Sequence, residues 1–112
     1  MKNYKEYVRH ILDEVAYIMA QSRRLTYEQL VGDPTLLRAF VRSIEVIGEA
    51  SKKIPDDIKA RYPGIEWKKI AGTRDVLIHH YFDIDYEILW DIISHKIPEL
   101  EKSIRNMLDD QG

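Results

Sequence analysis

The chain has 112 residues, is 45% hydrophobic and 32% charged, and carries a formal net charge of −2. These values predict one globular domain with a hydrophobic core and argue against a disordered chain. The small negative charge argues against a broad basic surface for nucleic acids, so any RNA contact should be local.

Cysteine is absent, which excludes disulfides and thiolate metal sites and suits a reducing cytoplasm. No apolar run approaches the roughly 20 residues of a transmembrane helix. The N-terminal stretch MKNYKEYVRH lacks the apolar core of a signal peptide. We therefore expect a cytoplasmic protein that does not bind membranes.

The first segment has the apolar spacing of an amphipathic helix that ends near Gln21. Its stripe comprises Tyr4, Tyr7, Val8, Ile11, Leu12, Val15, Ile18 and Met19. A short turn or helix, TYEQLVGD, follows, with Thr26 as its expected N-cap.

The second long helix has a clear start, because Asp33 can cap it and Pro34 suits its first position. It should end near Lys53, since Ile54 precedes Pro55 and residues before proline disfavour the helical region. Its apolar face comprises Leu37, Phe40, Val41, Ile44 and Ile47. The stretch PDDIKARYPG predicts a short connecting helix.

A third long helix should start at Glu66 or Trp67 and run into the stretch GTRDVLIHHYFDIDY. Asp83 or Asp85 can cap a fourth, which Pro98 should kink or break near residues 96–97. The apolar positions of that fourth helix are Ile88, Leu89, Ile92, Ile93, Ile97, Leu100, Ile104 and Leu108.

Together these segments predict an all-α fold, an antiparallel four-helix bundle with a short extra helix, in a single domain over residues 1–112. No alternating strand pattern, internal repeat or low-complexity linker appears in the sequence. The apolar faces are broad, which favours burial of one more face in a homodimer.

The octapeptide RDVLIHHY combines residues that can cleave RNA without a metal ion. Arginine offers a planar fork of donors that suits a phosphate, and histidine can exchange a proton near neutral pH. Cleavage needs a base for the 2′-hydroxyl, a cation for the phosphoryl oxygens and an acid for the leaving 5′-oxygen. From these residue types alone, an ordinary solvated helix end remains the competing interpretation.

Spacing complicates this hypothesis. On an ideal helix, Arg74 and Tyr81 lie within about 20° of each other, whereas His79 is rotated by about 140° from Arg74. Either the helix distorts near Ile78, or the working pair is assembled across a dimer interface. Asp75 lies within about 40° of His79 and could orient the imidazole.

A polar stripe on the second helix is a further candidate. It comprises Arg38, Arg42, Glu45 and Glu49, which span about 60° on an ideal helix. It is either a solvated face with weak ion pairs or one side of a cleft opposite the motif. In the second case Arg42 would help to hold RNA and Glu49 would position Arg74.

The sequence predicts neither a metal site nor a cofactor. Adjacent His79 and His80 point in different directions on a regular helix and cannot chelate one ion. Asp83 and Asp85 could in principle bind a hard cation, but capping of a helix explains them better.

At residues 74–81 the sequence resembles the R-x4-H-x-Y motif of the HEPN superfamily, with Arg74, His79 and Tyr81 in the motif positions. The HepT toxin branch is the most similar. The flanking stretches RSIEVIGEASKKIP, YPGIEWKKIAGTRD and YFDIDYEILWDIISHKIPEL resemble that branch as well. The resemblance covers most of the chain from about Arg38 to Leu100.

This resemblance implies an all-α dimer with the motif in a cleft between protomers, and a metal-independent endoribonuclease that cuts tRNA or mRNA. It implies a type VII-like toxin–antitoxin system, in which a minimal nucleotidyltransferase antitoxin transfers AMP to Tyr81. One position departs from the family, which often has asparagine where this chain has Asp75. An ionised carboxylate only accepts hydrogen bonds and could pair with Arg74. This favours the alternative, a non-catalytic module that binds a nucleotide or docks a nucleotidyltransferase.

Overall fold

A computed structural model describes residues 3–78 and 83–110 of the chain. In chain order its helices are α1 (Tyr4–Ser22), α2 (Tyr27–Val31), α3 (Pro34–Lys52), α4 (Asp56–Ala60), α5 (Trp67–Leu77), α6 (Tyr86–Asp91), the π-helical turn η1 (Ile92–Lys96) and α7 (Ile97–Asp109). The predicted all-α fold is confirmed, and the described residues form no strand beyond one isolated bridge.

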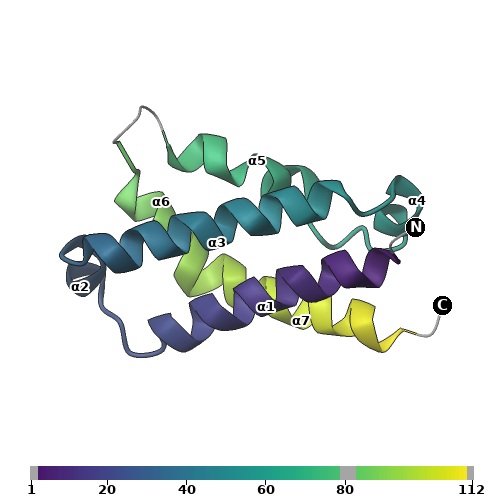
Figure 1. Ribbon diagram of the computed structural model, residues 1–112, viewed down its shortest axis with the longest axis horizontal. Helices are drawn as coiled ribbons and strands as arrows, with labels where there is room; N and C mark the ends of the chain where they lie inside the picture. The colour runs from purple at the N-terminus through teal and green to yellow at the C-terminus, as the bar shows by residue number, and fades with distance from the viewer. Residues whose placement is uncertain (1–2, 79–82, 111–112) are drawn as a thin grey trace.

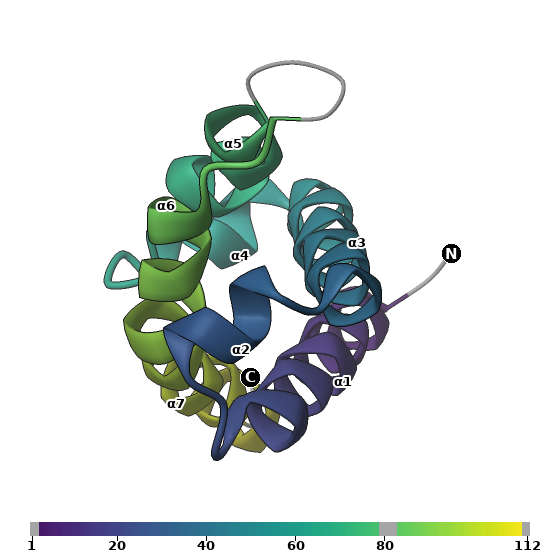
Figure 2. The same ribbon diagram turned by 90° about the vertical axis from the view of Figure 1, so that its left-hand side faces the viewer.

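Four long segments run along the molecule in alternating directions: α1, α3, α5 and the continuous run α6–η1–α7 (Figure 1). α3 packs against both α1 and α5, and α1 also packs against α7. The start of α1 and the end of α7 lie at the same end of the molecule as α4. The end of α5 and the start of α6 lie at the opposite end, where α2 crosses the bundle (Figure 2).

The helix starts follow from local capping. Thr26 and Gln29 form a reciprocal capping box at α2, and the Asp33 side chain accepts from the amide of Leu36 at α3. Pro34 occupies the first turn of α3, where its missing N–H costs nothing. These predicted starts are confirmed, as is the end of the second long helix, since α3 ends at Lys52.

Pro98 changes the helix geometry in the way the sequence predicts. A proline inside a helix lacks an N–H and collides with the carbonyl one turn earlier. Here the turn before it widens into η1, and the amide of Ile97 donates to the carbonyl of Ile92, five residues back. The predicted break near residues 96–97 is therefore present as a π-helical turn, a known way to adjust a helix.

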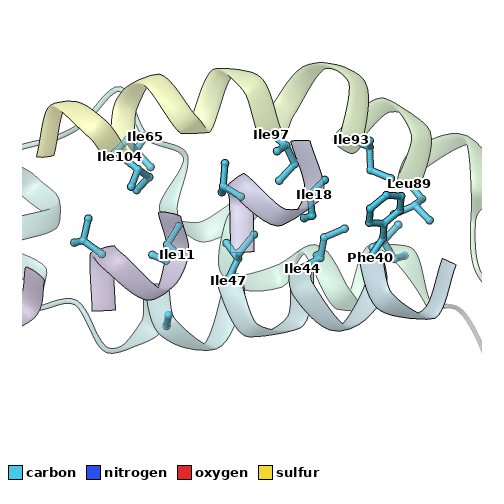
Figure 3. Packing of buried hydrophobic residues seen from close by; sticks show 14 of the residues in the cluster. Ile11, Ile18, Phe40, Ile44, Ile47, Ile65, Leu89, Ile93, Ile97 and Ile104 are labelled. Carbon is cyan, nitrogen blue, oxygen red and sulfur yellow. The ribbon is translucent and has the colours of Figure 1, made fainter. Parts of the chain in front are cut away.

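The core is one apolar cluster along the length of the bundle. Its fully buried members include Val8, Ile11, Val15, Ile18, Leu30, Phe40, Leu77, Leu89, Ile104 and Met107. Phe40 lies beside Leu89 and Ile93 at the α6 end, whereas Ile11, Ile65 and Ile104 lie toward the other end (Figure 3). Within the described part of the chain, none of the helices combines the length and apolar character that a membrane span requires.

Candidate active site

The motif arginine lies in the last turn of α5, at the end of the molecule that also holds α2. The Arg74 side chain is 53% exposed, so its guanidinium can reach a ligand in solvent. The other two motif residues, His79 and Tyr81, lie outside the described residues, as does His80. The structure therefore places one member of the R-x4-H-x-Y motif.

The helix stops inside the motif. Ile78 has φ −109° and ψ 105°, an extended conformation, and pairs in an antiparallel bridge with Ile84. The amide of Asp85 donates to the carbonyl of Leu77 at 2.9 Å, a carbonyl that a longer helix would bond to its own next turn. Of the two geometries open from sequence, a distortion near Ile78 is therefore present.

The chain enters α6 directly after this bridge. The Asp85 side chain accepts from the amide of Ile88 at 3.0 Å and caps the helix, as one of the two aspartates was predicted to do. Asp83 precedes the cap and is exposed. Asp83 therefore belongs to neither helix, since α5 ends at Leu77 and α6 begins at Tyr86.

Arg74 makes an ion pair with Glu45 of α3, with its Nε 2.8 Å from Oε2. The other carboxylate oxygen of Glu45 accepts from Nη1 of Arg42 at 2.6 Å. Glu45 thus bridges two guanidinium groups that belong to different helices. We name this set, Arg42, Glu45 and Arg74, the arginine–glutamate triad.

The electrostatics of the triad favour the ionised carboxylate. The hydrogen bond from Arg42 holds the pKa of Glu45 below its usual range, against an opposing contribution from partial burial. The charges of Arg42 and Arg74 add to the lowering. Glu45 is therefore an anion at neutral pH, and the triad as a whole carries one net positive charge beside the motif.

The supporting residues predicted from sequence are only partly placed as expected. Arg42 belongs to the triad, and its side chain is 72% exposed. The ion pair of Glu49 is with Lys52 on its own helix, at 3.4 Å from Nζ, and not with Arg74. Asp75 is exposed, and within the described residues the ion pair of Arg74 is with Glu45 rather than Asp75.

Glu45 is the contact that sequence reasoning missed. The available signal was its place in the polar stripe of α3, between Arg42 and Glu49. That stripe is narrow, so its spacing alone does not decide which carboxylate faces α5.

Gly48 explains how α3 and α5 come close enough for this ion pair. A Cβ added there would lie 3.2 Å from the carbonyl oxygen of Ile70 and 3.6 Å from that of Ala71. The missing side chain lets the two backbones approach, one turn along α3 from Glu45 and one turn along α5 from Arg74. A small cavity of about 180 Å³ lies here, lined among others by Gly48, Glu45 and Arg74.

A larger groove lies on the other side of α5. It has a volume of about 490 Å³ and is bordered by α5 and by the α6–η1–α7 run, with Ile44 and Ile47 of α3 among its lining residues. Val76 on its border is 52% exposed, unusual for a large apolar side chain on α5. The groove is mainly apolar, and on its border Glu66 lies 2.8 Å from Nζ of Lys69 and 3.9 Å from Nζ of Lys96.

The described residues offer little for a metal ion, since among them no three His, Asp or Glu side chains are grouped to hold one. The chemistry that the described part of the site can supply is a fixed cation. Arg74 presents it at the end of a helix, and Glu45 holds it in place.

Comparison with known proteins identifies the family. The model of the "Ribonuclease HepT-like" family matches residues 5–107. A protein of Caldanaerobacter subterraneus subsp. tengcongensis named "Putative RNase" is 44% identical over 108 residues, which cover 96% of each chain. A "Putative RNase" of Methanocaldococcus jannaschii is 39% identical over 109 residues, 97% of this chain and 90% of that protein.

A third relative carries the family name itself. The "Probable ribonuclease HepT" of Thermococcus cleftensis is 37% identical over 100 residues, 89% of this chain and 91% of that protein. No solved structure matches the chain. The family model and these relatives cover nearly the whole chain, and the chain belongs to the HepT-like ribonuclease family of the HEPN superfamily.

Proposed function

We propose that this protein is a metal-independent endoribonuclease and the toxin of a type VII-like toxin–antitoxin pair. The observation that supports it most directly is Arg74, an exposed guanidinium held by Glu45 at the end of α5, within an R-x4-H-x-Y motif. Membership of the HepT-like ribonuclease family supports the same reaction class.

In this mechanism a base removes the proton of a ribose 2′-hydroxyl, and the resulting oxygen attacks the adjacent phosphorus. The bond to the 5′-oxygen breaks, and an acid donates a proton to that leaving oxygen. His79 is assigned to one of these proton transfers, because imidazole can act as acid or base near neutral pH. Arg74 stabilises the charge that builds on the phosphoryl oxygens.

The complementary proton transfer needs a second group, and a homodimer would supply it. With the motif in a cleft between protomers, the second His79 would act as the partner acid or base. The exposed Val76 and the apolar groove beside α5 support the presence of a protein–protein interface on this face, as a homodimer requires. Arg42, exposed beside Arg74, would bind a flanking phosphate of the RNA.

The activity would be regulated by modification of Tyr81. A minimal nucleotidyltransferase antitoxin would transfer AMP from ATP to the hydroxyl of Tyr81, with release of pyrophosphate. The added phosphate would bring negative charge next to Arg74 and compete with the RNA phosphate for it.

The test uses purified, unmodified protein, checked by intact mass, with a mixed RNA pool that includes tRNA and with EDTA present. We expect cleavage by the wild type and none by His79→Ala or Arg74→Ala at unchanged thermal stability. Arg105→Ala serves as the control, because Arg105 is exposed on α7, far along the chain from the motif. Full cleavage by His79→Ala would refute the assignment.

One feature of this chain favours a second candidate, a non-catalytic module that binds a nucleotide or docks a nucleotidyltransferase. Asp75 stands next to Arg74, where relatives of the superfamily often have asparagine, and adds negative charge beside the phosphate site. A toxin should arrest growth when expressed alone and lose that effect with His79→Ala. A binding module should do neither, and Asp75→Asn would then be the first change to test for cleavage.

A further inference from the structure

We propose that Glu45 is a positioning residue for Arg74. Glu45 fixes the guanidinium of Arg74 so that its outer nitrogens face the phosphate of the substrate. This inference rests on the proposed ribonuclease function. It assigns the role to Glu45 of α3, one helical turn before the position that the sequence favoured, and it gives Arg42 a share in the same arrangement.

The geometry of the ion pair matters more than its existence. The contact of Glu45 with Arg74 is at Nε, which lies 2.8 Å from Oε2. A guanidinium carries N–H donors on Nε and on both Nη atoms. The contact therefore uses the inner edge of the group and leaves the N–H groups of both Nη atoms for a phosphoryl oxygen.

Arg42 prevents Glu45 from competing with the substrate. The carboxylate of Glu45 has two oxygens, and Arg42 holds Oε1 at 2.6 Å while Arg74 approaches Oε2. With Oε1 on Arg42, Glu45 gives a single oxygen to Arg74 and does not form with it the bidentate pair that would block a phosphate. The triad keeps one excess positive charge, which is available to an anion.

Burial separates this contact from the ion pair of Glu49 on the same helix. The Glu45 side chain is 30% exposed, whereas Glu49 is 66% exposed. The backbones of α3 and α5 meet at Gly48, so the carboxylate is presented from a rigid element one turn away. Exposed ion pairs add little to stability, and the consequence expected here is an effect on the rate of cleavage.

The experiment compares Glu45→Ala and Glu45→Gln with wild type on a short RNA, with kcat and KM determined separately. Glu101→Gln is the matched control, because Glu101 is 25% exposed and pairs with an arginine one turn away on α7. A small displacement of a group that stabilises the transition state can cost about a hundredfold in rate. We expect kcat to fall by about tenfold to a hundredfold in Glu45→Ala, less in Glu45→Gln, with KM changed by less than about threefold.

A second readout does not depend on activity. In ¹⁵N NMR spectra, the Nε–H signal of Arg74, assigned by its loss in Arg74→Lys, should be protected from exchange in wild type and in Glu101→Gln. It should broaden or disappear in Glu45→Ala. Loss of the Arg74 signal in Glu49→Gln, together with an unchanged signal in Glu45→Ala, would overturn the proposal. It would assign the positioning role to Glu49 instead.

The two readouts separate this inference from the proposed function. An unchanged Arg74 signal in Glu45→Ala overturns the positioning role, whatever the cleavage assay shows. An unchanged kcat in Glu45→Ala also overturns it. If the wild type cuts no RNA and the Arg74 signal is still lost in Glu45→Ala, the ribonuclease function fails while the hold of Glu45 on the anion-binding arginine stands.

Discussion

Replacement of Phe40 would test the core packing that supports the candidate active site. Phe40 lies on α3, is fully buried, and contacts the α6 end of the core beside Leu89 and Ile93 (Figure 3). Phe40→Ala removes the ring, and the surrounding helices can fill the space only in part. A buried phenylalanine replaced by alanine costs about 3–5 kcal/mol of unfolding free energy, from lost transfer energy and the cavity together.

That loss is a large part of the total free energy of unfolding. At about 0.05–0.15 kcal/mol per residue, a domain of 112 residues has roughly 6–17 kcal/mol of unfolding free energy. The melting temperature should fall by about 10–20 °C. Because the ring supports α6, which begins just after the motif, cleavage should also weaken at temperatures where the variant is still folded.

Urea unfolding followed by far-UV circular dichroism measures the change, and Val31→Ala is the control because Val31 is 42% exposed on α2. We expect the control to lie within about 0.5 kcal/mol of wild type. A loss below about 1.5 kcal/mol for Phe40→Ala, with an unchanged slope against urea, would refute the packing described here.

Three further predictions concern single positions. Thr26→Ala breaks the capping box of α2 and should cost about 0.5–2 kcal/mol in a thermal melt, whereas Thr26→Ser should not. Gly72→Ala should stabilise α5 by about 0.5–1 kcal/mol, because nothing lies within 4 Å of the added methyl. Gly48→Ala should instead destabilise the protein, since its methyl meets a backbone carbonyl of α5 at 3.2 Å. The pKa of Glu45 is lowered by Arg42 and then Arg74, so its stabilising contribution is complete above the ordinary carboxyl pKa and is lost as the pH falls through the lowered value. Melting curves below about pH 4.5 should therefore depend less steeply on pH in Glu45→Gln than in wild type.

The sequence predicts the helix limits well where a local cause sets them. Thr26, Asp33 and Asp85 accept hydrogen bonds from amides that their own helices leave free. Pro98 forces a local change because it lacks an N–H, although the π-helical form of that change is not encoded in the proline alone. Such signals act within a few residues, so no tertiary information is needed to read them.

The partner of Arg74 could not be predicted in the same way. Glu45 and Glu49 lie one turn apart on the same stripe, and periodicity treats them alike. The choice depends on where α5 crosses α3, and that crossing depends on the close approach at Gly48. A contact between helices distant in sequence is a property of packing, which the local pattern contains only indirectly.

The spacing of the motif has a physical explanation once the end of α5 is known. A five-residue step on an ideal helix turns the chain by about 140° and would place the arginine and histidine on different faces. This calculation holds only while the backbone stays helical, and Ile78 leaves the helical region four residues after Arg74. The arginine is thus positioned by helix packing through Glu45, while Ile78, just after the helix end, pairs with Ile84. The helix that holds Arg74 ends at Leu77, before the other two motif positions, so helical periodicity alone is not a valid argument against the chemistry of the motif.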